Sequence, residues 1–284
     1  MRLASQNYGK QHVRVLKVLR PASSDLGSRH EVKELDVGVR LEGAFELSYS
    51  AADNSNVVPT DTLKNTVQVL AHEHLGVETE PFALLLARHL LERYAQIERV
   101  TIETSERLWA RMEVGGRPHD HAFSGQAARP LVEVVADRGR DPVLTSGIAD
   151  LLVMKSTGSG FAGFPRDEYT TLPEVSDRIL ATEIEGRWRY SETPPSYAAA
   201  NREILGAMLR AFAVPYSPSV QATLYGMAEA ALSACAEIDQ IALKLPNKHY
   251  LPANLAPFGL DATGVSFVPT DQPHGLIEAT LSRE

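Results

Sequence analysis

Hydrophobic and polar residues alternate along residues 37–49, which is the clearest pattern in the chain. The odd positions carry the apolar side chains, from Val37 and Val39 to Leu47 and Tyr49, and the even positions carry mainly polar or small ones. Because successive side chains of a strand point to opposite faces, this period of two predicts one long strand with a buried face. Strands of this length are typical of extended antiparallel sheets. Residues 12–20 are predicted to form its partner strand, across a polar loop at residues 23–29.

Two segments with helical spacing follow this strand. Residues 61–75 are predicted to form a helix, with Thr60 as its N-cap residue and Asp61 beside the positive end of the helix dipole. Residues 80–99 carry apolar side chains at intervals of three and four, which predicts a second helix. The first half of the chain therefore places two helices after two strands.

Strands return after these helices, and the second half of the chain then repeats the whole order. Further strands are predicted at residues 100–114 and 129–137. In the second half, strands are predicted at residues 149–156 and 179–190 and helices at 197–212 and 219–235. Three further strands are then predicted at residues 238–245, 264–269 and 276–281. This pattern predicts an α+β fold of two tandem half-domains, residues 1–138 and 139–284, each an antiparallel sheet with helices on one face. Open sheet edges favour oligomerisation through strand pairing.

Composition and charge narrow the class of protein. The chain has 284 residues, 44% of them hydrophobic and 23% charged, which is typical of a globular protein. A net charge of −8 without a basic block argues against a nucleic-acid partner. The sequence predicts neither a secretory signal nor a membrane span, and its last residues are not a peroxisomal tripeptide, so we expect a cytoplasmic location. Cys235 is the only cysteine, which excludes an intrachain disulfide.

Two histidine pairs are the first candidates for chemistry. His119 and His121 would face the same side of a strand and could share a metal ion. His72 and His74 fall near the end of a predicted helix, where positions two apart do not face each other. A metal site also needs further ligands, and histidine pairs at this spacing recur by chance. We therefore predict no metal site at either pair.

Familiar nucleophile and nucleotide motifs are missing from the sequence. It contains no Gly-x-Ser-x-Gly elbow, Walker loop or dinucleotide-binding fingerprint. The Gly-rich residues 157–164 lack the Gly-Lys-Ser ending of a phosphate-binding loop. Such a loop is commonly a flexible connection, but its small residues would also leave the ring of Phe161 open to a flat ligand.

Several short motifs, taken together, resemble the urate oxidase family in order and spacing across nearly the whole chain. They are Tyr8-Gly9-Lys10, Asn54-Ser55-Asn56, Pro59-Thr60-Asp61, the segment 156–172, Ser176-Asp177-Arg178-Ile179-Leu180, the segment 219–225 and Leu245-Pro246-Asn247-Lys248-His249-Tyr250. The resemblance implies the tunnelling fold (T-fold), with four chains assembled around a central β-barrel tunnel. It implies oxidation of urate by O2 and water to 5-hydroxyisourate and hydrogen peroxide, without metal or organic cofactor, at active sites shared between subunits.

The resemblance also implies which residues hold the purine. Arg178 and Gln221 correspond to the pair that grips it, and a guanidinium fork and an amide suit its carbonyl and N–H edge. Phe161 would stack on the ring, as aromatic faces do with planar heterocycles. Leu172 and Val220 would close the pocket, with the Val220 backbone amide as a further hydrogen-bond partner.

The remaining implied site residues handle protons and oxygen. Lys10, Thr60 and His249 correspond to the proton-handling set, with Lys10 and Thr60 supplied by a neighbouring subunit. A lysine desolvated at an interface has its charged form disfavoured, which suits it to act as a base. Asn247 corresponds to the residue that holds dioxygen or water above the ring, and Asp61 lines the site beside Thr60.

Plainer roles and other functions compete with these assignments. Alone, Arg178 would be expected to form a surface ion pair with Asp177 or Glu174, Thr60 to cap a helix, and Lys10 to be a solvated charge. One alternative function is a metal-dependent purine or pterin hydrolase or synthase of the same fold, using the histidine pair at residues 119 and 121. Another is a purine-binding scaffold without catalysis. The joint presence of Lys10, Thr60 and His249 favours the oxidase over the scaffold, and the lack of a nearby cysteine weakens the hydrolase.

Overall fold

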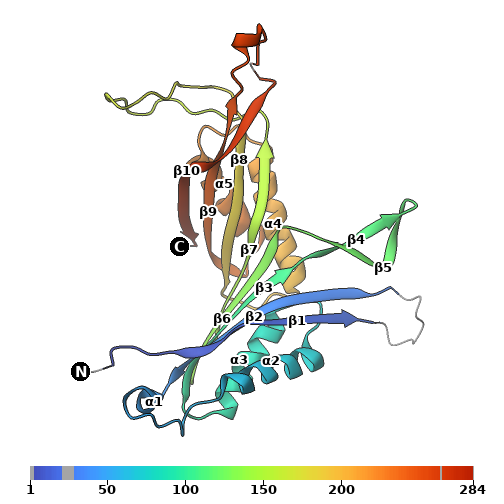
Figure 1. Cartoon of the computed structure of the whole chain (residues 1–284), viewed down its shortest axis with the longest axis vertical. Coiled ribbons are helices and arrows are strands. Elements are labelled where there is room, and N and C mark those ends of the chain that lie inside the picture. The colour runs from blue at the N-terminus through green and yellow to red at the C-terminus, as the bar shows by residue number, and fades with distance from the viewer. Residues whose placement is uncertain (1–2, 21–28, 263, 284) are drawn as a thin grey trace. The chain divides into compact units, whose positions relative to one another are not determined.

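The computed structural model describes residues 3–20, 29–262 and 264–283. The chain forms two compact units (Figure 1). Unit one contains Met1–Gly147 and Arg189–Ala198, and unit two contains Ile148–Trp188 and Ala199–Glu284. The predicted loop at residues 23–29 lies outside the described residues except for Arg29. The predicted division at residue 139 into half-domains stays a prediction.

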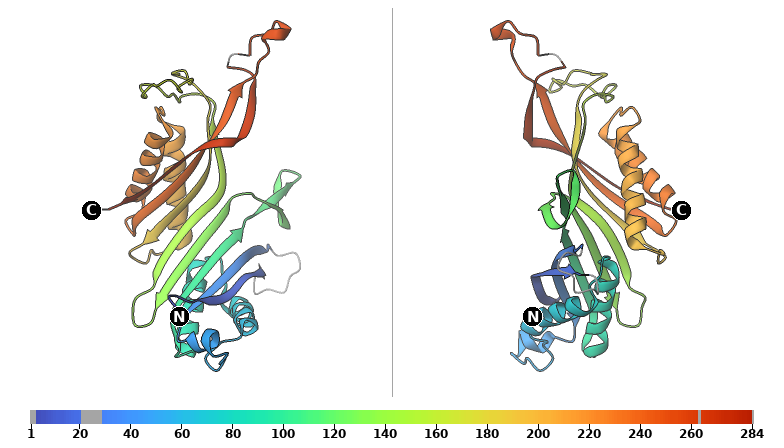
Figure 2. Two further views of the ribbon diagram at one scale, coloured as in Figure 1. Left: turned by 60° about the vertical axis from the view of Figure 1, so that its left-hand side comes forward. Right: turned by 90° about the vertical axis from the view of Figure 1, so that its right-hand side faces the viewer.

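An antiparallel sheet covered by helices on one face forms unit one (Figure 2). Its strands lie in the order β1 (Tyr8–Leu19), β2 (Glu31–Gly43), β3 (Ile97–Arg107) and β6 (Arg129–Asp137). The helices α2 (Thr60–His74) and α3 (Glu80–Arg93) pack on the sheet, α2 against β1 and α3 against β3 and β6. The predicted pairing of the first two strands and the return of residues 129–137 beside β3 are both confirmed.

The alternation that predicts the long strand is confirmed only as far as Gly43. Val37, Val39 and Leu41 are fully buried beneath the helices. Beyond Gly43 the prediction is wrong, because the short helix α1 (Glu46–Ser50) replaces the strand. The chain leaves the sheet after Gly43. The backbone packs closely there, since a Cβ on Gly43 would lie 2.1 Å from the Gln96 carbonyl oxygen. Leu47 and Tyr49 are consequently exposed and contribute nothing to the sheet core.

The helix limits also differ from prediction. Pro59, and not Thr60, is the N-cap of α2, and no side chain caps that end. Thr60 is already helical, since the Leu63 amide donates to the Pro59 carbonyl at 3.2 Å. The second helix ends at Arg93 rather than at residue 99, because Tyr94 is extended and Ile97 already belongs to β3.

A separate hairpin replaces the second part of the strand predicted at residues 100–114. β4 (Trp109–Val114) pairs with β5 (Arg117–Gly125) and with neither β3 nor β6. Val100 and Ile102 are buried, whereas Met112 and Val114 are about half exposed. The apolar side chains of residues 100–114 thus do not share one buried face. Hydrophobic alternation indicates a strand but does not identify the sheet to which it belongs.

Unit two repeats the sheet-and-helix arrangement. Its strands lie in the order β7 (Val143–Lys155), β8 (Leu180–Tyr190), β9 (Ile238–Pro252) and β10 (Phe267–Ser282), although the first residues of β7 and the last two of β8 are counted with unit one. Helices α4 (Tyr197–Ala213) and α5 (Val220–Ala234) cover one face, and the short helix η1 (Ala256–Phe258) lies between β9 and β10. β7 and β9 are longer than predicted, and β10 joins the two strands predicted at residues 264–269 and 276–281.

The core of unit two contains the odd-numbered side chains of β9. Ile241, Leu243 and Leu245 are buried at 0%, 2% and 0% exposure, which marks this face as the one under the helices. Trp188 of β8 is also buried, and its indole N–H donates to Asn201 Oδ1 at 2.9 Å. The predicted α+β fold, with strands, helices and strands in each half, is therefore confirmed. No described helix is long and apolar enough to cross a membrane.

A buried ion pair crosses from β2 to β3 in unit one. Lys33 Nζ lies 2.5 Å from Glu106 Oε2 and donates to the Val77 carbonyl at 2.8 Å. Their side chains are 9% and 13% exposed. Burial raises the pKa of Glu106, and the charge of Lys33 opposes that rise. The pair therefore keeps an ionised carboxylate inside the fold, where alone it would be strongly destabilising.

We predict that Lys33→Met lowers the free energy of unfolding by about 3 kcal/mol, because Glu106 is left buried without its partner. Urea denaturation measures this loss. The ionised form of Glu106 is the destabilised one, so the loss is present at neutral pH and shrinks as the pH falls. Adding Glu106→Gln to the variant is expected to restore much of the stability. A Lys33→Met protein as stable as the wild type at neutral pH would contradict this account.

Candidate active site

Close strand pairing places Lys10 on β1 in unit one. Lys10 lies opposite Val39, and a Cβ on the preceding Gly9 would fall 1.8 Å from the Val39 carbonyl oxygen. Only glycine fits this position without displacing β2. The register then shifts between Lys10 and Val13, and His12 adopts a positive φ of 58°. The glycine of the Tyr8-Gly9-Lys10 motif is thus explained by backbone packing.

The start of α2 is held beside the start of β1. The Val58 amide donates to the Tyr8 hydroxyl at 2.8 Å, and the Tyr8 ring meets Phe45 edge-on at 4.8 Å. Near the other end of α2, the Ala71 carbonyl accepts a hydrogen bond of 3.1 Å from Lys17 Nζ on β1. These contacts fix the two ends of α2 against β1. They bring the first residues of the helix close to the Lys10 side of the strand.

Lys10, Thr60 and Asp61 consequently share one neighbourhood in unit one. A hydrogen bond from Lys64 at 2.5 Å lowers the pKa of Asp61, and the charge of Lys10 acts in the same direction. Thr60 and Asp61 are exposed, and Lys10 is half-buried. The structure brings these three predicted site residues together at the surface of unit one.

The other predicted site residues all belong to unit two, where a long connection between β7 and β8 carries three of them. Phe161 pairs with Val175 through two backbone hydrogen bonds, of 2.8 and 3.0 Å. The Arg178 amide donates to the Ser159 carbonyl at 2.8 Å. The two ends of the connection are thereby joined, which places Arg178 beside Phe161. Leu172 lies within the connection, six residues before Arg178, and is 51% exposed.

The Arg178 guanidinium lies over an aromatic ring and forms no ion pair with a carboxylate among the described residues. Its Cζ is 5.6 Å from the centre of the Phe161 ring, which in turn stacks on Phe164 at 4.9 Å. Its Nε is buried without a hydrogen-bond partner in the described part of the chain. Burial lowers the pKa of Arg178 from its ordinary value. A half-buried guanidinium whose Nε has no partner carries a desolvation cost and is therefore suited to a ligand with acceptor oxygens.

The surface ion pair considered for Arg178 is not formed. Asp177 instead accepts hydrogen bonds from Thr157 Oγ1 at 2.9 Å and from the Gly158 amide at 2.8 Å. Glu174 accepts from the Gly163 amide at 3.1 Å. Both carboxylates therefore shape the backbone of the connection and leave the guanidinium available. This assignment of the two acids could not be made from their spacing in the sequence.

Val220 and Gln221 open helix α5 in the same unit. Ser219 caps the helix by accepting from the Ala222 amide at 3.1 Å. Val220 is 3% exposed, and Gln221 is exposed. The first amides of a helix have no acceptor within it, so this end presents N–H donors beside the Gln221 side chain. The connection reaches this point, because the Gly160 amide donates to the Ser217 carbonyl at 2.8 Å.

Asn247 and His249 lie on β9 where the buried face of the sheet ends. They follow Leu245 on the odd-numbered face, but both are only half-buried. Lys248 points to the other face and donates to Glu183 at 2.8 Å, which raises its pKa. The helix-covered face therefore changes from apolar to polar between Leu245 and Asn247. This change supplies hydrogen-bonding groups at the edge of a dry core.

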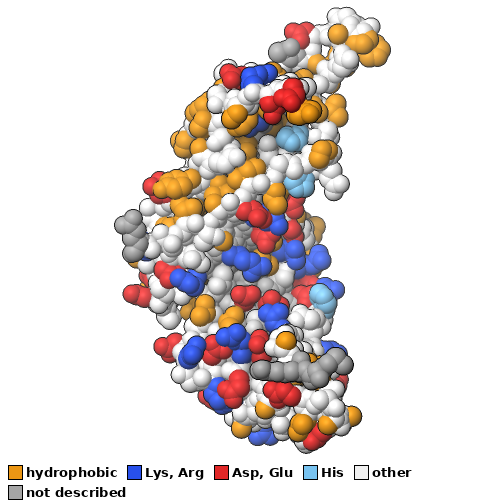
Figure 3. Space-filling view, turned by 90° about the vertical axis from the view of Figure 1, so that its left-hand side faces the viewer, with side chains coloured by type: hydrophobic (Ala, Val, Ile, Leu, Met, Phe, Trp, Pro, Cys, Tyr) orange, Lys and Arg blue, Asp and Glu red, His pale blue; other side chains and the backbone are white. Residues whose placement is uncertain are grey.

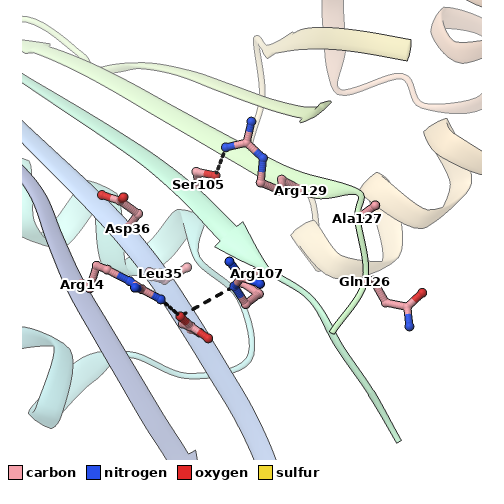
Figure 4. Close-up of a pocket in the computed structure, with 9 residues that line it drawn as sticks. Arg14, Leu35, Asp36, Ser105, Arg107, Gln126, Ala127 and Arg129 are labelled. Carbon is pink, nitrogen blue, oxygen red and sulfur yellow. Dashed lines mark hydrogen bonds and ion pairs between the residues drawn. The ribbon is translucent and has the colours of Figure 1, made fainter. Parts of the chain in front are cut away.

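Glu34, a residue not predicted to be functional, organises a cleft of about 400 Å³ in unit one (Figure 4). It is hydrogen-bonded to Arg14, and Trp109 Nε1 donates to its other oxygen at 2.9 Å. Arg107 lies 3.9 Å away, and Arg129 donates to Ser105 at 3.0 Å. None of the predicted site residues lines this cleft. Its charged groups have partners, which is the arrangement of a structural cluster: Arg14 and Arg107 meet Glu34, Arg129 meets Ser105, and Asp36 meets His12 outside the lining.

The histidine pair at residues 119 and 121 lies on β5, with ring centres 4.7 Å apart. The His121 amide donates to His119 Nδ1 at 3.3 Å, so one of the ring nitrogens already has a partner. Across the described ranges, no three acidic, histidine or cysteine side chains are placed to hold a metal ion. His72 and His74 belong to the last turn of α2 and are exposed.

Tyr216 is the residue near this site that the sequence did not reveal. Its hydroxyl donates to the Ser176 carbonyl at 2.9 Å, two residues before Arg178. The sequence marks this tyrosine only by its place between Pro215 and Pro218, in a segment that directly precedes the cap residue Ser219. Such a segment predicts a rigid turn but does not reveal what the phenol contacts.

Comparison with known proteins identifies the family of this chain. A family model described as Uricase matches residues 6–135 and 144–278. The chain is 41% identical to a uricase of Arthrobacter globiformis, over 99% of this chain and 90% of that protein. It is 39% identical to uricase-2 isozyme 2 of Glycine max, over 98% of this chain and 94% of that protein. The crystal structure of the Arthrobacter globiformis uricase superposes with a TM-score of 0.92 at 40% identity, covering 100% of this chain and 96% of that one. The chain therefore belongs to the uricase family.

Proposed function

We propose that this protein is a urate oxidase of purine degradation. Urate gives up two electrons to O2, which leaves as hydrogen peroxide, while water supplies the hydroxyl group of the product 5-hydroxyisourate. The proposal rests on family membership and, within the structure, on one observation above all. Arg178 is desolvated beside the Phe161 ring, and its Nε has no partner among the described residues.

Substrate binding follows from the chemistry of unit two. Urate is a flat, electron-rich anion with carbonyl oxygens on its edge, so it suits an aromatic face next to a guanidinium fork. Phe161 would stack on the purine, and Arg178 would donate to its acceptors. Gln221 and the Val220 amide, at the start of α5, would hold an adjacent edge. Leu172, now exposed, would cover the bound ring.

Proton transfer is assigned to Lys10, Thr60 and His249. Loss of protons makes urate easier to oxidise, so a base near the ring accelerates electron transfer to O2. Lys10 would act as that base through the hydroxyl of Thr60, which makes no cap hydrogen bond in α2 and is therefore available. His249 would assist within the same network, and Asp61 would line the site beside Thr60.

Oxygen is assigned to Asn247. Its amide follows the last buried residue of β9 on the same face, so it would hold O2 or water at the boundary of a water-excluding core. These roles require positioning, desolvation and proton transfer, which side chains supply. We therefore propose a reaction without metal or organic cofactor.

Assembly completes the site in this proposal. Lys10, Thr60 and Asp61 belong to unit one, whereas Phe161, Arg178 and Asn247 belong to unit two. We propose a homotetramer around a β-barrel tunnel, in which each site combines unit one of one chain with unit two of another. Large apolar side chains are exposed on the strands of unit two, where Figure 3 shows apolar side chains gathered, and they would be covered there: Leu152, Met154, Leu251, Val268 and Leu276. The cytoplasmic location stays a prediction.

We predict that chelator-treated protein oxidises urate at the same rate as untreated protein. Absorbance of urate, uptake of O2 and production of peroxide are followed together, and equimolar O2 and peroxide are expected. Activity that returns only after zinc is added would instead favour the metal-dependent alternative. Tight urate binding without turnover would favour the scaffold.

We predict that Arg178→Met lowers kcat/KM for urate by about 10²- to 10³-fold, since a charge-assisted pair of hydrogen bonds is lost. Melting temperature is expected to stay the same or rise, because a desolvated charge is removed. Arg166→Met is the matched control, since Arg166 lies on the same connection with its Cζ 5.7 Å from the Phe164 ring centre and is not assigned to the substrate. Similar activities for the two variants would refute the assignment.

We predict that Lys10→Met lowers kcat by at least about 100-fold, the scale of general-base catalysis, while binding of xanthine as an inert purine stays nearly unchanged. Steady-state kinetics and calorimetric titration separate the two effects. Lys17→Met on the same strand provides the comparison, because its contact with the Ala71 carbonyl is structural and its removal affects stability. Unchanged turnover of Lys10→Met, or loss of xanthine binding, would count against the role of Lys10.

A further inference from the structure

We propose that Tyr216 is a positioning residue that holds Arg178 and Phe161 in the geometry that binds the purine. The inference rests on the proposed function, and it assigns a role to a residue outside the predicted site. Tyr216 lies in the short segment between α4 and α5, residues 214–219, which we call the bracket.

The bracket is tied to the connection between β7 and β8 at several points. Lys155 Nζ, at the end of β7, donates to the Pro215 carbonyl at 2.8 Å. The Gly160 amide donates to the Ser217 carbonyl at 2.8 Å, and the Ser217 amide donates to the Gly158 carbonyl at 2.9 Å. The beginning of the connection is thereby fixed to the bracket by contacts that do not involve the Tyr216 side chain.

The Tyr216 hydroxyl supplies a tie to the other end of the connection. It donates to the Ser176 carbonyl at 2.9 Å, two residues before Arg178. Tyr216 and Arg178 are also near enough to interact electrostatically. The phenol therefore ties the bracket to the stretch of chain that leads to the guanidinium.

Gly160 shows how closely the phenol packs. A Cβ at this position would lie 2.1 Å from the Tyr216 hydroxyl oxygen and 2.8 Å from the Val175 carbonyl oxygen. Gly160 directly precedes Phe161, so the phenol passes over the backbone that carries the aromatic ring. Tyr216 thus contacts both sides of the Arg178–Phe161 pair, one through Ser176 and the other through Gly160.

This placement has a functional consequence because the rest of the connection is weakly anchored. Residues 165–169 and 171–174 are exposed, and most of the hydrogen bonds between 163 and 174 stay within the connection. Binding a rigid, flat ligand demands that guanidinium and ring be fixed in advance. Removal of the hydroxyl would loosen the Arg178 end by removing its tie to the bracket, while the hydrogen bond from the Arg178 amide to the Ser159 carbonyl remains.

Tyr216→Phe tests this role, with Tyr225→Phe as the matched control. The two tyrosines are 55% and 57% exposed, and Tyr225 lies on α5 away from the bracket. We expect Tyr216→Phe to raise KM for urate and the dissociation constant of xanthine about tenfold, the effect of one lost hydrogen bond. We expect kcat to change less than about twofold, because the proton-handling groups are untouched. Tyr225→Phe is expected to match the wild type.

A double-mutant cycle with Gly160→Ala gives a second, independent measurement. Its methyl group displaces the hydroxyl, so Gly160→Ala should raise KM in the wild-type background and raise it less in Tyr216→Phe. Strictly additive effects of the two substitutions on KM would overturn the inference. An unchanged KM in Tyr216→Phe would also overturn it, whether or not kcat and the melting temperature fall. A wild-type protein that does not oxidise urate would refute the proposed function instead, and xanthine binding would then still test the role of Tyr216.

Discussion

Each sheet must bury one face beneath a pair of helices, and the positions of the site residues follow from that constraint. The buried face of β9 is apolar as far as Leu245 and becomes polar at Asn247 and His249. On β1, the same requirement ties α2 to the strand and brings its first turn near enough to Lys10 for that charge to act on Asp61. In both units the polar groups lie where helical cover ends, so the core supplies a dry boundary without burying the reactive groups.

The buried charges of the two units are treated differently: Lys33 and Glu106 in unit one are paired, whereas the Nε of Arg178 in unit two has no partner among the described residues. Lys33 and Glu106 neutralise each other inside unit one, where no ligand is needed. Arg178 is desolvated without such a partner, and the carboxylates nearest to it in sequence bond to backbone amides instead. This is the contrast expected between a structural ion pair and the anion site that we propose at Arg178. It also gives a reason for the hydrogen bonds that join the two ends of an otherwise irregular connection.

The sequence predicts the repeated order of strands and helices because alternation and helical spacing are local signals. It fails where local pattern and tertiary pairing disagree: Leu47 continues the alternation but lies in a helix, and Met112 continues it in a separate hairpin. The site residues were identified by resemblance to a family, and the contacts that hold them were not predictable. The role of Asp177 as a backbone acceptor and the contact of Tyr216 with Ser176 depend on loop geometry, which has no periodic signature.

The two tryptophans of the chain lie in different units. Trp109, in unit one, donates to Glu34, and Trp188, in unit two, is buried and donates to Asn201. Each unit therefore carries its own fluorophore, and the two indoles lie in environments of different polarity, one beside a carboxylate and the other in the hydrophobic core. Replacing either indole leaves a single emitter, so the unfolding of the two units can be followed separately by intrinsic fluorescence without attaching a label.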